Sequence, residues 1–414
     1  MWGLCQGSGK DPYKAQIELA GPSFKCTCPS RKFPCKHGLG LYLLYARNAA
    51  AFSDNAAPSW VSDWLESREK RSELKAAKVA EAAQHPEDAA AKAQGQQKRQ
   101  EKRQGNVEAG LAVLDIWLGD LAREGLAALR SRPAKDWEAM AARLVDTQAS
   151  GLAGRIRRAG MLIYGSSVAG WELAVARELA QVALLSSAYR RLAALPPSLA
   201  TDVKTAIGWV MNQDEVLAEP GVDDHWHVCG KLTQDDGRIA RRTCYLFGQR
   251  SRRWALILQF SAGNQPLPPP LIPGTAYQGA IHFYPGAAPM RAVMGPGLQL
   301  LGAAPAVRLD RALPALLDDY ARTLARNPFV EQFPMLLESV SSQVAAEPEA
   351  VFSLRDAQGA LLPLDRAFRR GWQLHALSGG APVTVFGLWN GDTFLPLSVT
   401  VEGRLHLLDL ERAE

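Results

Sequence analysis

The sequence predicts an α+β protein in three parts, namely a small ββα unit, a helical bundle and a β-rich α+β region. Alternating apolar and polar residues followed by a helical pattern occupy residues 1–65. Apolar residues then recur at alternating spacings of three and four over 107–220, and short aromatic and β-branched runs occupy 224–414. A charge-rich segment, 66–105, separates the first two parts.

The composition is that of a globular protein. With 414 residues, 47% of them apolar, the chain is long enough for two or three domains with buried cores. Charged residues make up 21% of the chain, and no apolar run approaches the roughly 18 residues needed to cross a bilayer, so we expect no membrane insertion. The first ten residues lack the basic and apolar regions of a secretory signal. We therefore expect a cytoplasmic protein whose cysteines stay reduced.

The ββα unit begins with two predicted strands. Residues 12–19 alternate apolar and polar side chains, as in a half-buried strand, and Gly21-Pro22 then marks a turn. Cys26 and Cys28 follow on one face of the second strand, because side chains alternate along a strand.

Two helices are expected next. Residues 36–50 have a helical pattern that places His37 in the first turn. Residues 58–68 place Trp60 and Trp64 four residues apart, on one helical face, and this helix is expected to pack back on the unit.

The middle of the chain changes from a charged linker to a bundle. Residues 66–105 have almost no large apolar side chains and are rich in Lys, Arg, Glu, Gln and Ala, so we expect a flexible linker, at most transiently helical. Amphipathic helices are predicted over 110–129, 136–149 and 171–195, the last ending at Pro196-Pro197, within a bundle that extends from 107 to about residue 220.

The last part is predicted to be rich in strands, without an internal repeat that would reveal their arrangement. One helix is expected over 309–325, and Asn390-Gly391 is a strong hairpin turn. The expected strands are 225–232, 241–249, 253–260, 277–285, 351–354, 360–364, 382–389 and 394–401.

Three cysteines and one histidine fall within CTCPSRKFPCKH, residues 26–37, although the chain has only six cysteines. Cys26 and Cys28 lie two apart on a strand, so their sulfurs face the same way, while Cys35 and His37 approach from the start of the helix. Thiolates and imidazole are the usual ligands of a structural, tetrahedral Zn²⁺. We therefore predict that these four residues bind one zinc ion. The alternative, buried thiols beside a helix-capping histidine, is disfavoured by four such residues in twelve.

The same residues resemble the SWIM-type zinc finger, whose pattern is CxC, a variable spacer and CxH; here the spacer is PSRKFP. The segments WGLCQGSGK, GLGLYLLYA and PSWVSDWL, and the helical GLAVLDIWLGDLAREGLAAL and DWEAMAARLVDTQASGLAGRIR, are similar to bacterial members of that family. The resemblance covers about half of the chain. Similar proteins usually have more residues before the counterpart of Trp2-Gly3, which suggests a late start or a missing strand.

The resemblance implies zinc binding by Cys26, Cys28, Cys35 and His37, a proposed role in binding DNA or other proteins, and no catalytic activity. Bacterial relatives are thought to sit beside AAA ATPases and von Willebrand A-type proteins. An adaptor or scaffold of such a complex, with a purely structural zinc, is therefore the alternative function.

Positive charge is concentrated around the cysteine cluster. The formal net charge is +5, and residues 1–50 hold seven lysines and arginines against two acidic residues. Lys25, Arg31, Lys32 and Lys36 surround the predicted ligands and are our candidate nucleic-acid contacts, since lysine and arginine neutralise phosphates. They could equally compensate the negative charge of the zinc thiolates, and the sequence leaves both interpretations open.

No catalytic motif is recognisable, so we expect a protein that is not an enzyme and has no small-molecule substrate. Gly9-Lys10 is followed by aspartate, which breaks the phosphate-loop pattern. An enzymatic site, if present, would lie beyond residue 220, around Asp224, His225 and His227. A second metal site formed by these histidines and Cys229 is disfavoured, because no fourth ligand lies nearby in the sequence.

Overall fold

The computed structural model describes the chain except for residues 8–10, 19–22, 31–34, 49–51, 54, 71–85, 165–169, 236–238, 263–266, 269–270, 346–350 and 409–414. Its elements confirm the α+β class. The chain forms two compact units, which are described separately. The first comprises Met1–Gln100, Asp235–Arg241 and Gln259–Pro270; the second comprises Glu101–Gln234, Arg242–Leu258 and Leu271–Glu414.

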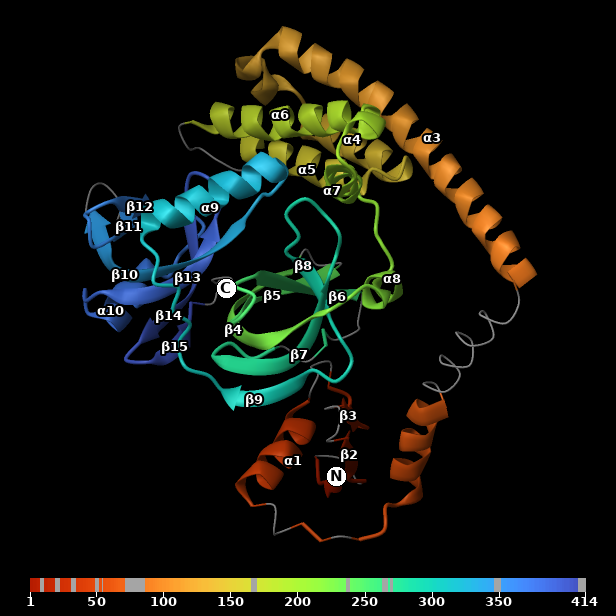
Figure 1. Cartoon of the computed structure of the whole chain (residues 1–414), viewed down its shortest axis with the longest axis vertical. Helices are drawn as coiled ribbons and strands as arrows, with labels where there is room; N and C mark the ends of the chain where they lie inside the picture. Colours follow the sequence, from red (N-terminus) through yellow and green to blue (C-terminus); the bar gives the residue numbers. More distant parts are fainter. Residues whose placement is uncertain are drawn as a thin grey trace. The chain divides into compact units, whose positions relative to one another are not determined.

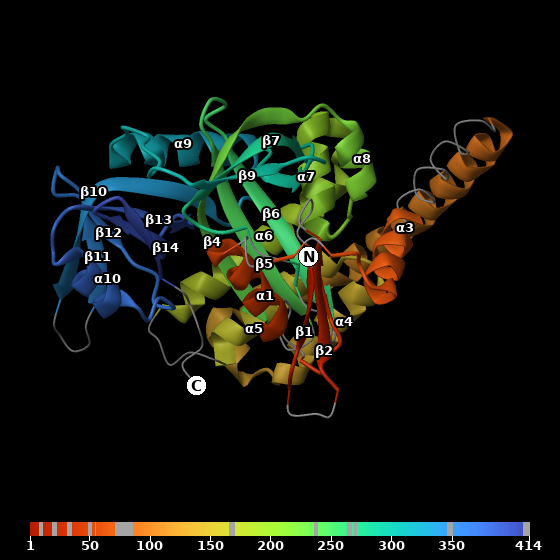
Figure 2. The same cartoon turned by 90° about the horizontal axis from the view of Figure 1, so that it is seen from below.

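The N-terminal part is a three-stranded antiparallel sheet followed by a helix, and we call it the finger. Its elements are β1 (Trp2–Cys5), β2 (Tyr13–Glu18), β3 (Ser23–Cys26) and α1 (Lys36–Arg47), with the strands in the order β1-β2-β3. Figure 2 shows β1 and β2 running side by side. The predicted strands and helix are present, but β3 ends at Cys26, so Cys28 lies beyond the strand on which it was predicted. β1 adds a strand that the sequence pattern did not reveal.

Apolar contacts join the sheet of the finger to its helices. Ile17 is buried on β2, and Gly38 on α1 lies so close to the Phe24 ring that a Cβ there would be 3.1 Å from it. A second helix, residues 59–70, packs back on the sheet as expected. Its Trp60 ring meets the Trp2 ring edge to face, with centroids 5.9 Å apart.

The segment predicted to be a flexible linker, 66–105, is helical in its described residues, 66–70 and 86–105. The second stretch is the beginning of α3 (Pro86–Glu124), which continues into the bundle without a break. Alanine, glutamine, lysine and arginine are strong helix formers, so the absence of large apolar residues does not prevent a helix here.

The bundle packs α3 and four further helices around one core. These are α4 (Ala134–Asp146), α5 (Ser150–Tyr164), α6 (Trp171–Arg190) and α7 (Pro197–Ile207). The short α8 (Gln213–Ala218), inside the range predicted for the bundle, instead contacts the barrel strands that follow. Leu111, Leu114 and Trp137 are buried, and the rings of Trp117 and Trp137 meet edge to face at 5.1 Å. The predicted helices are present, and these tryptophans pack in or against the bundle core. No helix in the described part of the chain is both long and apolar enough to span a bilayer.

A closed five-stranded barrel follows the bundle (Figure 1). It is built from β4 (Val222–Asp235), β5 (Ile239–Gly248), β6 (Trp254–Ala262), β7 (Thr275–Phe283) and β8 (Arg291–Met294) in the order β4-β5-β6-β8-β7. The pairing of β7 with the first half of β4 closes it, and β6 and β8 are parallel. A short β9 (Gln299–Ala303) continues along β7 beyond β8. This strand order is that of the OB-fold, a Greek-key barrel.

A six-stranded antiparallel sheet completes the chain and uses the order β12-β11-β10-β13-β14-β15. Helices α9 (Leu313–Arg326) and α10 (Gly371–Ser378) pack on this sheet. The strands are β10 (Phe333–Ala345), β11 (Val351–Arg355), β12 (Leu361–Pro363), β13 (Val383–Trp389), β14 (Phe394–Val401) and β15 (Arg404–Leu407).

Part of the outer face of the barrel is buried against this C-terminal sheet. The Phe386 ring of β13 lies 5.7 Å from that of Tyr245 on β5 and 5.2 Å from that of Trp254 on β6. The Ser398 hydroxyl of β14 donates to the Cys229 carbonyl of β4 at 2.6 Å. Barrel and sheet therefore share one hydrophobic core.

The β-rich region also contacts the bundle within the second unit. Phe329, on the loop between α9 and β10, is part of the bundle core. Glu331 on the same loop pairs with the buried Arg155 guanidinium of α5 at 2.7 Å. Asp202 of α7 accepts the backbone N–H of Ala287 at 2.7 Å.

Candidate metal centre

The four predicted ligands come from two elements of the finger. Cys26 is the last residue of β3 and Cys28 lies two positions further. Cys35 is the N-cap of α1, where its sulfur accepts the Gly38 N–H at 3.5 Å, and His37 lies in the first turn of the same helix. A residue that caps a helix has its side chain directed back over the first turn, which brings this sulfur toward β3.

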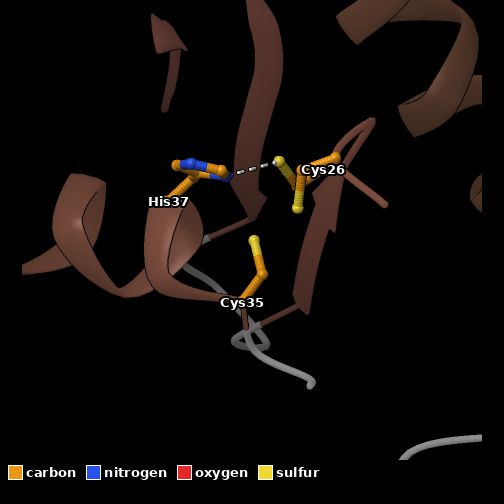
Figure 3. A group of neighbouring side chains, drawn as sticks. Cys26, Cys35 and His37 are labelled. Carbon is orange, nitrogen blue, oxygen red and sulfur yellow. Dashed lines mark hydrogen bonds between the residues drawn. The ribbon is translucent and has the colours of Figure 1, made fainter. Parts of the chain in front are cut away.

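The ligand atoms converge at a single point. The three sulfurs and one imidazole nitrogen all lie within 4.8 Å of one another, and the Cys26 Sγ is 3.8 Å from the His37 Nδ1. Figure 3 shows Cys26, Cys35 and His37 pointing toward a common centre. A tetrahedral site with Zn–S bonds of about 2.3 Å has sulfur–sulfur edges of about 3.8 Å, so the cluster fits a zinc ion. Cys5 lies on β1, outside this group.

Comparison with known families gives independent support. Residues 102–207 match the SWIM-associated four-helix bundle domain. The match starts within α3 and ends with α7, so it covers the bundle and about a quarter of the chain. No curated protein and no solved structure matches the chain. A SWIM-associated bundle together with a Cys3His cluster fits a zinc-binding SWIM-type protein.

The thiols of this cluster differ in acidity. Burial, with a smaller contribution from the side chains of Cys28 and Cys35, raises the pKa of Cys26 to about 12. Burial also acts to raise the pKa of Cys35, but the Gly38 N–H and the neighbouring thiols outweigh it and lower that pKa. Because a zinc-bound cysteine is a thiolate, zinc binding here would release a proton from Cys26.

Two of the four candidate nucleic-acid contacts lie in the part of the chain that the structure describes. Lys25 on β3 and Lys36 at the start of α1 are exposed and lie next to ligands in the sequence. Arg31 and Lys32 lie outside the described residues. Sequence reasoning missed Lys14, which is exposed on β2 with its ammonium 5.8 Å from the centre of the Trp60 ring. Its position among the polar residues of the alternating pattern over 12–19 could have indicated this exposure.

The histidines and the acid flagged beyond residue 220 do not form one site. The Asp224 carboxylate, 1% exposed, accepts the backbone N–H groups of Arg250 and Ser251 at 3.0 and 2.7 Å. It therefore holds the turn between β5 and β6. His227 instead lines a separate cavity. Among the described residues, the group with metal-ligand geometry is the Cys3His cluster.

We expect Asp224→Asn to destabilise the protein by about 1–3 kcal/mol at neutral pH. The neutral amide that replaces the carboxylate is a weaker acceptor for the two backbone N–H groups of the turn. Burial acts to raise the Asp224 pKa, but the donated N–H groups outweigh it and lower that pKa. The stabilisation is therefore present above the ordinary pKa of aspartate and disappears as the pH falls through the folded value. Urea unfolding at several pH values should show wild type and variant converging in acid; a constant difference would contradict this role.

Proposed function

We propose that this chain is a zinc-binding, non-enzymatic binding protein whose SWIM-type finger recognises nucleic acid or a protein partner. The observation that carries the proposal is the convergence of four ligand atoms within 4.8 Å. Four protein ligands complete the zinc tetrahedron and leave no position open for a substrate, which favours a structural metal. The ion would join the end of β3 to the start of α1 and so fix the surface that the finger presents.

Positive charge beside the metal ligands supports nucleic acid, and DNA in particular, as the partner. Lys25 and Lys36 flank the cluster, and both are exposed. Lys14 adds a third exposed cation on the sheet of the finger. Each ammonium that contacts a phosphate releases a counterion, so binding of this kind depends steeply on salt.

If three to five cations contact phosphates, log K for duplex DNA should fall with log salt at a slope of about −3 to −5. Replacing both Lys25 and Lys36 with glutamine should make the slope shallower by about 2 units. Fluorescence anisotropy with a labelled duplex measures this. Lys135→Gln, at an exposed position on α4, is the matched control. A wild-type slope near zero would exclude phosphate recognition.

Apolar side chains on α1 favour a protein partner as the second candidate. Leu43 and Leu44 are 58% and 63% exposed, and Leu39 and Tyr42 are 44% and 41% exposed. Exposed apolar groups gathered on one helix are typical of protein-binding surfaces. The resemblance to bacterial SWIM-type proteins supports an adaptor for an AAA ATPase and von Willebrand A-type complex.

A pulldown from native lysate, with and without nuclease, separates the two partners. Protein capture that persists after nuclease treatment and at high salt, and is lost in Leu43→Glu, would support the adaptor. Capture abolished by nuclease and by the double lysine substitution would support nucleic acid. Capture unchanged by every substitution would contradict recognition by the finger.

A further inference from the structure

A cavity of about 300 Å³ lies between the barrel and the C-terminal sheet, within the second unit. His227 on β4 forms part of one wall, and Thr384 on β13 and Thr400 on β14 form part of the wall opposite. The segment 303–307, which follows β9, and the turn before β15 complete it. Its size suits a small metabolite, since binding pockets begin at roughly 300 Å³.

The position of the cavity is notable because of the topology of the barrel. OB-fold barrels bind ligands on the outer face centred on their second and third strands, which here are β5 and β6. That face carries Tyr245 and Trp254, and Phe386 of the C-terminal sheet covers both rings. The cavity lies beside this covered face, along the outer side of β4, where barrel and sheet separate. It is therefore a gap beside the contact between barrel and sheet, lined by β4 on the barrel side.

The polar groups in the cavity favour a negatively charged ligand. The residues that line it include Arg404, which is exposed at its edge, His227, Thr384 and Thr400, but no aspartate or glutamate. The two threonines are directly opposite one another across the β13–β14 pair, so both can donate to one acceptor.

The rest of the lining is apolar and includes Pro273, Val307, Leu336 and Leu405. A ligand that matches both the polar and the apolar parts of the lining has an apolar body and one acidic group. We propose that this cavity binds a small organic anion of that kind, held by Arg404, His227 and the threonine pair. This site is separate from the finger and does not depend on the function proposed for it.

The probe for this site is 8-anilinonaphthalene-1-sulfonate, which has an apolar body and one anionic group. Its fluorescence should rise saturably with the native full chain. Ala306→Phe, at an exposed position of the lining, should fill the cavity and weaken binding at least tenfold. Arg404→Gln should weaken it about five- to tenfold by removing the cation. Ala360→Phe, also at an exposed position but outside the cavity, should leave the affinity unchanged.

The uncharged analogue N-phenyl-1-naphthylamine tests the charge preference and should bind at least fivefold more weakly than the sulfonate. Circular dichroism of each variant establishes that it is folded. Equal affinity of wild type and folded Ala306→Phe for the sulfonate would overturn the site. Equal affinity of wild type for the charged and uncharged probes would overturn the assignment of an anion.

Discussion

Purified wild-type protein is expected to contain one zinc ion per chain, and Cys35→Ala protein close to none. Cys35 supplies one of four converging ligand atoms, and its loss leaves three, too few for a closed structural site. Zinc binding in small fingers has apparent free energies of roughly 10–16 kcal/mol at neutral pH, so a lost ligand should cost most of the affinity. Elemental mass spectrometry of the two purified proteins measures the stoichiometry.

Cys5→Ala is the matched control, because Cys5 belongs to the same sheet but lies outside the cluster. It should retain full zinc content. Chelation of the wild type should unfold the finger while sparing the bundle, whose core contains none of the four ligands. Limited proteolysis should then cut within residues 1–47 and leave 102–207 intact. Equal zinc in wild type and Cys35→Ala would show that the ligand set is wrong.

Phe386→Ala is expected to lower the unfolding free energy of the second unit by about 3–5 kcal/mol, as for other fully buried phenylalanines. The Phe386 ring is 2% exposed and packs against Tyr245 and Trp254. A Cβ on Gly230 would lie only 2.7 Å from it, so the barrel approaches this ring closely and has little freedom to repack. Chemical unfolding monitored by tryptophan fluorescence measures this free energy, and Trp254 beside Phe386 contributes to the signal.

Phe260→Ala provides the comparison, since the Phe260 ring on β6 is 52% exposed. We expect that substitution to change stability by no more than about 0.5 kcal/mol. The loss of stability in Phe386→Leu should fall between the losses in the two alanine variants, because leucine keeps part of the apolar volume. A loss below about 1 kcal/mol for Phe386→Ala would mean that barrel and sheet do not depend on each other for stability.

The candidate metal site was predictable because its determinants are local. Cys26 and Cys28 are separated by one residue, as are Cys35 and His37, and a strand end and a helix start suffice to orient them. The cavity was not predictable in this way. Its walls join His227 to Thr400, residues far apart in the chain, and nothing in either local pattern indicates that they face each other.

The same contrast between local and long-range determinants applies to the fold. Runs of strongly periodic residues predicted most bundle helices and several strands, whereas β10 was missed. It contains Pro334, which normally argues against a central strand, and Ser339, which adopts a positive φ of 54° where the register shifts. The closure of the barrel by β4 and β7 also depends on pairing between distant residues, such as Trp226 with Tyr277.

Closure of that barrel has a consequence for self-association. Because the first half of β4 pairs with β7 as well as with β5, that half offers no free row of N–H and C=O groups to another copy of the chain. In the C-terminal sheet, the outermost strands β12 and β15 have three and four residues, and Pro363 removes a donor from the first. Short, interrupted margins of this kind are poor templates for amyloid-like stacking, so the C-terminal sheet should resist strand-mediated self-association.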